Sequence, residues 1–402
     1  MSTTAYAPQA TEVGQSRQAR IAAVDLLRGA VMILMAIDHV RVYSGVPAGG
    51  PAPGVFFTRW ITHFCAPAFI FLAGTSAFFY GRRHADLSRF LLNRGLWLIF
   101  LELTALRLAW TFNLDFRHYE LAGVIWVIGV CMVLMAGAVK LPLKAIAAFG
   151  LTVIAAHNLV DSRIVSWVEH LNEHTASGFW KILYVGFYAG PVQLGSLQLF
   201  VLYSIIPWIG VMAAGYAFGK VLTFEPTRRR KLCLVIGFSA IGLFLLLRGF
   251  NLYGDPFPWH RGSRMPALLA FLNTTKYPAS LCFLLMTLGP AIASMPLLES
   301  VSGSAIARVV NVFGRVPFFY YVLHIPLIHA LALVISKLRF GYINPWLFTN
   351  HPMGNPRPPA GYTWDLWLLY LVWAIVIVVL YFPCRRFAAL KARRTDWWLR
   401  YL

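Results

Sequence analysis

Residues 20–43 read RIAAVDLLRGAVMILMAIDHVRVY, an apolar stretch with charged side chains near both ends. A helix of this length can cross a bilayer, because it rises about 1.5 Å per residue against about 30 Å of hydrocarbon. The whole chain is similarly apolar: of 402 residues, 59% are hydrophobic and 12% are charged. Soluble domains carry about 25% charged residues. The composition therefore predicts an all-α polytopic membrane bundle.

The polar side chains of this first stretch are arranged along one stripe. At about 100° per residue, Asp25, Arg28 and His39 lie within a sector of about 60°, whereas Asp38 and Arg41 are rotated away from it. Charges in a membrane helix usually face the bundle interior or a wet cavity. The stripe could join chemistry near both membrane faces. Alternatively, the two Asp–Arg pairs, each three residues apart, only fix packing as ion pairs.

The apolar stretches predict about ten transmembrane helices in one domain, residues 20–390, between a disordered tail (1–19) and a basic tail (391–402). They cover approximately residues 21–43, 57–81, 90–112, 121–139, 142–160, 198–222, 232–250, 277–298, 309–336 and 364–384.

Charge predicts the orientation of these helices. The net charge of +20 would suggest nucleic acid binding in a soluble protein, but basic loops on the cytoplasmic side of a membrane explain it here, so nucleic acid is excluded. About 21 Lys and Arg residues fall on the side that holds both ends of the chain and about 11 on the other side. We expect a multi-pass protein of the plasma (inner) membrane with both termini in the cytoplasm.

Several common functional classes lack support in the sequence. The five cysteines lie in or beside apolar stretches without CxxC spacing, which favours neither disulfides nor a metal site. The histidines show no metal-binding spacing, so no metal is expected. No P-loop, dinucleotide fingerprint or serine nucleophile elbow is present.

Candidate catalytic groups gather near the outer ends of the first two helices, which a short loop connects. Asp38 and His39 end the first helix, and His63 precedes Pro67 at a similar depth in the second. A neutral imidazole supported by a carboxylate is a good general base. Asp38 need not touch the adjacent His39, since neighbours on a helix point about 100° apart, and it could meet His63 across the helix pair.

Further ionisable groups are candidates for substrate binding or support. Glu102 and Arg107 lie about 140° apart on the third helix, so their partners are expected on other helices. Lys276 lies at the outer mouth of the eighth helix and His324 in the ninth; His329 is expected to be a packing residue. Five arginines toward the cytoplasmic side could hold phosphate groups: Arg28, Arg82, Arg83, Arg94 and Arg315.

Four segments of the chain resemble a known family. VDLLRGAVMILMAIDHVR, THFCAPAFIFLAGTSAFFYG, NTTKYPASLCFLLMTLGP and FGRVPFFYYVLHIPLIHAL resemble bacterial relatives of heparan-α-glucosaminide N-acetyltransferase. The VDxxRG start and the PxFxFxxG element, Pro67 to Gly74, are the most specific parts. The resemblance implies an integral membrane acyltransferase that moves acetyl from cytosolic acetyl-CoA to an amino sugar on the far side.

The catalytic histidine of the family cannot be assigned to a residue of this chain by its position in the sequence. The proposed active histidine of the eukaryotic enzyme corresponds to residues near 51–53 here, where no histidine stands. An asparagine of that enzyme falls at His39, and an aspartate falls at His63. The family therefore implies acyl transfer and leaves the base open between these two residues.

Two functions from different classes follow. One is an acyltransferase with acyl-CoA, a carbohydrate amine or hydroxyl acceptor and membrane lipid as partners, and with a homodimer as a further option. The other is a proton-coupled transporter or flippase, in which the same polar stripe relays protons or ions. Binding of CoA separates the two.

Overall fold

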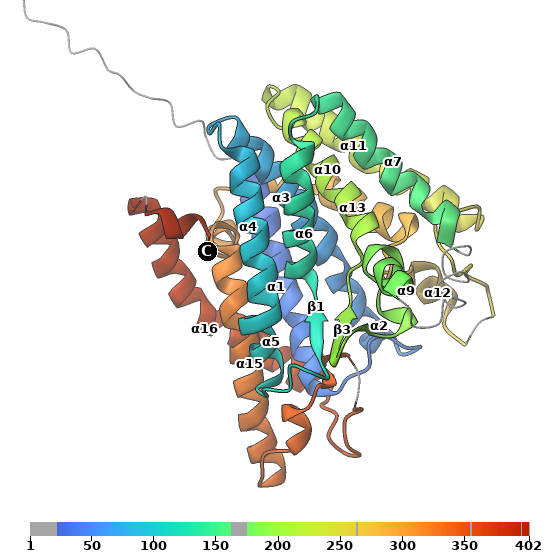
Figure 1. Cartoon of the computed structure of the whole chain (residues 1–402), viewed down its shortest axis with the longest axis vertical. Coiled ribbons are helices and arrows are strands. Elements are labelled where there is room, and N and C mark those ends of the chain that lie inside the picture. The colour runs from blue at the N-terminus through green and yellow to red at the C-terminus, as the bar shows by residue number, and fades with distance from the viewer. Residues whose placement is uncertain (1–21, 162–174, 263, 354–355, 395, 402) are drawn as a thin grey trace, which may run out of the picture.

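The computed structural model describes residues 22–161, 175–262, 264–353, 356–394 and 396–401, so the expected tail 1–19 lies outside the described residues. Long helices stand side by side and form the bundle (Figure 1). The α-helices are α1 (Ala22–Ser44), α2 (Pro53–Trp60), α3 (Cys65–Gly81), α4 (Leu87–Leu101), α5 (Arg107–Thr111), α6 (Val124–Ala138), α7 (Leu143–Ala156), α9 (Thr175–Trp180), α10 (Ile205–Val221), α11 (Pro226–Gly249), α12 (Ala267–Leu272), α13 (Leu281–Ser300), α14 (Ala305–Arg315), α15 (Pro317–Phe340) and α16 (Leu366–Arg393).

Shorter elements join or extend these helices. They are the π-helical turns η2 (Glu102–Leu106) and η4 (Lys181–Val185), the 3₁₀ turns η1 (Ile61–Phe64), η3 (His157–Val160), η5 (Gly186–Ala189), η6 (Pro345–Phe348), η7 (His351–Met353) and η8 (Trp397–Arg400), and the strands β1 (Glu120–Ala122), β2 (Val192–Leu194) and β3 (Leu197–Val201).

The predicted all-α membrane bundle is confirmed. All ten predicted apolar stretches are largely helical in the described part of the chain. Six helical segments there are each long and apolar enough to cross a membrane: Pro53–Gly81, Leu143–Val160, Pro226–Gly249, Leu281–Ser300, Pro317–Phe340 and Leu366–Arg393. Helix α1 has 23 residues and is comparably long, but it carries four charged side chains, Asp25, Arg28, Asp38 and Arg41.

The ninth predicted stretch, 309–336, is not one helix. It breaks at Val316, whose backbone has φ −133° and ψ 50°, and α15 begins at Pro317. Proline has no N–H to continue a helix, and it disfavours helical dihedrals in the residue before it. The break separates α14 from the long helix α15.

A small sheet replaces the predicted starts of two helices. Strand β3 pairs in parallel with β1 and antiparallel with β2, giving the order β1-β3-β2. The predicted stretch 121–139 therefore begins as strand β1, and the stretch 198–222 begins within β3. These pairings satisfy backbone groups where the chain enters α6 and α10.

Glycines bring α3 and α10 into close contact. A Cβ on Gly74 would lie 2.0 Å from the carbonyl oxygen of Met212, and one on Gly215 would lie 2.0 Å from that of Phe71. Small residues allow membrane helices to approach backbone to backbone. The PxFxFxxG element therefore ends at a close contact between two helices.

The bundle has two ends, which are named here by their residues. The basic end holds the start of α1, the connection 82–86 between α3 and α4, and the end of α16; Arg28 and Lys391 line one cavity there. The loop end holds the connections 45–52, 112–123, 250–280 and 341–365. The start of α1 and the end of α16 thus lie at the same end of the bundle, toward the upper left of the view in Figure 1.

Candidate functional site

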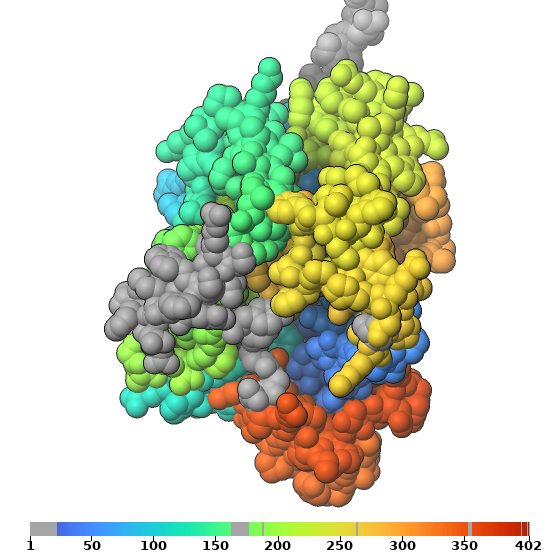
Figure 2. Space-filling model, turned by 90° about the vertical axis from the view of Figure 1, so that its right-hand side faces the viewer, coloured from blue at the N-terminus to red at the C-terminus, as the bar shows by residue number. Residues whose placement is uncertain are grey.

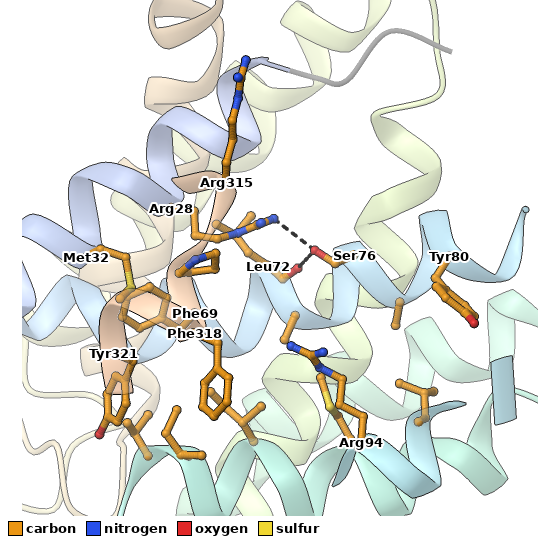
Figure 3. Close-up of a pocket in the computed structure, with 18 of the residues that line it drawn as sticks. Arg28, Met32, Phe69, Leu72, Ser76, Tyr80, Arg94, Arg315, Phe318 and Tyr321 are labelled. Atoms are coloured by element: carbon orange, nitrogen blue, oxygen red, sulfur yellow. Dashed lines mark hydrogen bonds between the residues drawn. The ribbon is translucent and has the colours of Figure 1, made fainter. Parts of the chain in front are cut away.

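A cavity of about 290 Å³ opens at the basic end. We call it the basic cavity. Its lining is mainly apolar, and α1, α4, α14 and α16 each contribute one cationic side chain to it; Figure 3 shows three of these, Arg28, Arg94 and Arg315. The lining residues used below are Arg28, Met32, Ser76, Arg94, Val124, Arg315, Phe318, Tyr321 and Lys391.

The structure brings together three of the five arginines that were predicted to hold phosphates. Arg28, Arg94 and Arg315 line the basic cavity, whereas Arg82 and Arg83 are exposed at the end of α3 and do not line it. Arg28 donates to Ser76 Oγ at 3.1 Å and to the Gly314 carbonyl oxygen at 3.2 Å (Figure 3).

The Arg28 guanidinium also lies 3.6 Å from the Asp25 carboxylate. The predicted ion pair three residues apart is therefore present. Arg28 also lines the cavity, and its role in binding stays a prediction.

A second cavity, of about 470 Å³, enters from the loop end; we call it the central cavity. Val124 and Tyr321 line both this cavity and the basic cavity. The two cavities therefore abut inside the bundle, with these two side chains between them. The polar and aromatic residues that line the central cavity are Asp38, His39, Arg41, Arg59, Glu102, Trp110, Tyr203, Tyr277, Tyr321, Trp346 and His351.

His39 lies in the central cavity and is hydrogen-bonded to a second histidine. Its Nδ1 is 2.6 Å from Nε2 of His324, and Nδ1 of His324 is 2.7 Å from the carbonyl oxygen of Tyr321. A carbonyl only accepts, so neutral His324 carries its proton on Nδ1 and accepts from His39 through Nε2. Neutral His39 then carries its proton on Nδ1, which leaves the lone pair on Nε2.

This arrangement suits a general base. His324 is fully buried, while His39 is partly exposed and edges against Trp110 at 4.8 Å between ring centroids. The backbone of Tyr321 orients His324, and His324 in turn fixes the tautomer of His39. A base oriented by a second group is the usual construction of an acyl-transfer site.

Asp38 does not orient either histidine. Its Oδ1 accepts from Arg41 Nε at 2.7 Å, and its Oδ2 accepts from Arg59 Nη1 at 2.6 Å. The predicted contact between Asp38 and His63 is replaced by this pair of ion pairs, which ties α1 to α2. Arg59, and not His63, contacts Asp38 because its long side chain reaches the carboxylate with a charged donor.

His63 lines a third cavity of about 270 Å³, which we call the loop-side pocket. His63 is 7% exposed, and its Nδ1 has no hydrogen-bond partner within the described residues. The pocket lies between the connections 45–60 and 250–280, which are in contact in Figure 2 (blue and yellow). Its lining includes Ala48, Phe56, Arg59, Trp60, His63, Phe257, Asn273, Thr274, Thr275, Lys276 and Tyr277.

The loop-side pocket abuts the central cavity. Ala48, Arg59 and Tyr277 line both. Three cavities therefore follow one another from the basic end to the loop end, divided first by Val124 and Tyr321 and then by these three residues. His63 and His39 lie in different cavities, so the structure separates the two candidate bases.

Glu102 lies against the first residues of α6. The backbone N–H groups of Gly123, Ile125 and Trp126 face its carboxylate. A Cβ on Gly123 would lie 2.4 Å from Oε1 of Glu102, so only glycine admits the carboxylate here. The N-terminus of a helix attracts negative charge, so the neighbour of Glu102 on another helix is a helix end; Oε2 of Glu102 is buried without a hydrogen-bond partner in the described residues.

Arg107 forms hydrogen bonds to a loop and does not line any of these cavities. It is 1% exposed and donates to the carbonyl oxygens of Tyr119 at 3.0 Å, of Asp115 at 2.5 Å and of Asn113. The expectation that its partners lie on another helix is wrong, because the chain after α5 folds back over its guanidinium. Arg107 shapes the connection that leads to β1.

His351 is a candidate residue that the sequence did not reveal. It lies in η7, is 2% exposed, and lines the central cavity; both of its ring nitrogens are buried without a hydrogen-bond partner in the described residues. Burial, with a smaller effect of the nearby His329, lowers the pKa of His351 to about 3. It belongs to a loop without periodicity, so no sequence signal separated it from the surrounding residues.

His329 is a packing residue, as predicted. Its Nδ1 is 3.2 Å from the carbonyl oxygen of Ala109 and its Nε2 is 2.9 Å from that of Leu347. A carbonyl only accepts and a neutral imidazole has one N–H, so His329 donates to one of these two oxygens and packs its other ring nitrogen against the second. In the described part of the chain, no three His, Cys, Asp or Glu side chains form a group that could hold a metal ion.

Comparison with known proteins identifies the family. No curated protein matches the chain. The family model described as "Heparan-alpha-glucosaminide N-acetyltransferase, catalytic" matches residues 20–249, which is more than half of the chain. The match includes His39, His63 and Glu102, whereas Lys276 and His324 lie beyond it. The chain therefore belongs to the heparan-alpha-glucosaminide N-acetyltransferase catalytic family and is a membrane transferase.

Proposed function

We propose that this protein transfers an acetyl or other short acyl group from acyl-CoA, bound from the basic end, to a sugar bound from the loop end. The observation that carries the proposal is the meeting of two cavities from opposite ends at Val124 and Tyr321, with His39 in the second. A transfer across a membrane needs such a meeting, because donor and acceptor enter from different sides.

The basic cavity suits the flexible arm of an acyl-CoA. Its volume of about 290 Å³ is just below the range of about 300–1,000 Å³ for small-molecule sites. It would hold the pantetheine arm and not the whole CoA. Arg28, Arg94 and Arg315 would bind phosphates at the rim, since guanidinium groups match phosphate oxygens geometrically. The acyl end would then lie near Tyr321.

The residues of the central cavity supply the chemistry of transfer. Nε2 of His39 takes the proton of the acceptor while the acceptor oxygen or nitrogen attacks the thioester carbonyl. The Tyr321 hydroxyl, which has no hydrogen bond within the described residues, donates to the oxyanion of the tetrahedral intermediate. The C–S bond then breaks, and the proton passes from His39 to the CoA thiolate.

The direction of transfer follows from charge. Basic residues are enriched at the basic end, and cytoplasmic loops of membrane proteins carry an excess of Lys and Arg. The basic end is thus the cytoplasmic side, where acyl-CoA is made. The loop end faces outward, where Trp60, Phe257 and Trp346 offer aromatic faces to a sugar ring.

The first experiment is titration of CoA, acetyl-CoA and longer acyl-CoAs into the purified chain in lipid nanodiscs, followed by calorimetry and thermal shift. We expect acetyl-CoA and CoA to bind and stabilise the protein. Arg94→Gln should weaken this binding, and the exposed Arg230→Gln should serve as the matched control. Absence of any CoA binding would contradict the proposal and favour the transporter or flippase alternative.

A further inference from the structure

The loop-side pocket carries more positive charge than the described residues around it neutralise. Two cationic side chains, Arg59 and Lys276, are among its described lining residues, and no carboxylate is. Lys276 is 8% exposed, and its side-chain ammonium forms no ion pair or hydrogen bond within the described residues. A buried ammonium has three N–H donors and is costly to desolvate without an anion.

The nearest carboxylate cannot compensate Lys276. Asp38 lies close enough to interact with it electrostatically, but both oxygens of Asp38 are taken, one by Arg41 and one by Arg59. Three cations thus share one carboxylate. Asp255, the acidic residue of the neighbouring loop, is occupied by Thr275 and Ser280 and lies 3.5 Å from Arg248.

Aromatic rings only partly stabilise the lysine. Its Nζ lies 5.1 Å from the ring centroid of Tyr277 and 5.9 Å from that of Tyr203. Such cation–π contacts contribute about 0.5–2 kcal/mol and leave the N–H donors unused. A second donor in the same pocket is also unused: Trp60 Nε1 is buried without a partner in the described residues.

The geometry points to a binding site for an anionic acceptor: the loop-side pocket holds its carboxylate or phosphate group at Lys276, and its hydroxyl reaches His39. This inference rests on the proposed function and names its acceptor class. An amine acceptor would enter as an ammonium and add positive charge to a pocket that already has an excess. A hydroxyl carries no charge and can lose its proton to His39.

The transfer then balances without a further reactant. The hydroxyl oxygen forms a C–O bond to the acyl carbonyl, and the C–S bond of the thioester breaks. The hydroxyl proton passes to His39 Nε2 and then to the CoA sulfur, so the products are an ester and free CoA. The anion stays bound at Lys276 and takes no part in bond making.

The test compares sugars of equal size and different charge: glucuronate, glucose 6-phosphate, glucose and glucosamine. Binding to the full chain in nanodiscs without CoA is followed by saturation-transfer NMR. We expect the two anions to bind more tightly than glucose, and glucosamine to bind most weakly. Lys276→Met should weaken the binding of the anions about 10- to 100-fold and leave glucose unchanged. Comparison of the two anions shows whether the pocket prefers carboxylate or phosphate.

Two further variants protect the interpretation. Lys276→Arg keeps the charge and should retain the preference for anions. This result would show that Lys276→Met loses anion binding because it loses the charge and not because it fails to fold. Lys337→Met changes an exposed lysine at the same end and should have no effect. Equal binding of all four sugars, or a preference for glucosamine, would overturn the inference. If Lys276→Met loses anion binding but the wild type transfers no acetyl group, the anion site would be supported and the proposed function would be contradicted.

Discussion

Replacement of His324 by leucine tests whether this residue positions His39, the proposed catalytic base. In the wild type, Nδ1 of His39 donates to Nε2 of His324 at 2.6 Å, which leaves the His39 lone pair on Nε2. Leucine removes the acceptor, and a buried donor without a partner costs about 1–3 kcal/mol. Since 1.4 kcal/mol is a factor of ten, the share of His39 in the productive tautomer should fall about 5- to 150-fold.

The assay measures transfer of radiolabelled acetyl from acetyl-CoA, together with calorimetric binding of CoA. His324→Leu should lower kcat by the factor given above and leave CoA affinity unchanged, because His324 does not line the basic cavity. His39→Ala should lose about 10²- to 10⁴-fold, the usual contribution of a general base. His39→Ala with full turnover would refute the assignment and move the base to His63.

Loss of folding is the competing explanation, because His324 is fully buried. His329→Leu is the matched control: it removes an equally buried histidine of α15 whose ring nitrogens contact only backbone carbonyls. That variant should lose stability but keep its kcat per folded molecule. Wild-type kcat in His324→Leu would show that His39 does not need this partner, and the tautomer argument would be wrong.

Four other predictions are independent of this pair. Arg94→Gln should weaken CoA binding at least tenfold, and Arg82→Gln, which removes an exposed arginine, less than twofold; equal losses in calorimetry would indicate a role in topology or lipid binding. Tyr321→Phe should lower kcat about 10²-fold with little change in KM, and an unchanged kcat would exclude its hydroxyl as an oxyanion donor. Because the folded-state pKa of His351 lies below its unfolded value, its contribution to stability is complete above about pH 6.5 and is lost as pH falls toward 3. Acidification from pH 7 to 5 should therefore lower the free energy of unfolding by about 2 kcal/mol. Thermal unfolding of His351→Gln should show a smaller effect of pH than the wild type. A reporter fused after residue 225 should report cytoplasm, and an external signal would reverse the proposed orientation.

Much of the bundle could be predicted because membrane helices are coded locally. An apolar stretch of sufficient length specifies a helix, and spacing three apart specifies which charges share its face. The ion pairs Asp25–Arg28 and Asp38–Arg41 were therefore predictable, and both are present. The α14–α15 break was missed although Pro317 marks it, because proline is also tolerated inside membrane helices, as Pro326 is in α15.

The contacts between helices were less accessible to sequence reasoning. Helical periodicity gives the direction of His39 on α1 but not which helix it meets, and its partner His324 is 285 residues away. The same holds for Glu102, whose partner is the N-terminus of a helix and not a charged side chain. Backbone N–H groups are present in every helix, so no residue type signals that one of them will bind a carboxylate.

The rearranged partners of Asp38 change how the loop end is understood. A carboxylate beside a histidine suggests a histidine general base supported by that carboxylate, as in hydrolases. In the sequence, His39 and His63 were both candidates for this histidine. In the structure the carboxylate is fully engaged by Arg41 and Arg59, and a neutral histidine takes its place behind His39. A neutral partner fixes the tautomer without raising the basicity of His39 as a carboxylate would. Positive charge is thereby kept at the loop end while His39 remains neutral, and these are the conditions that the proposed anionic hydroxyl acceptor requires.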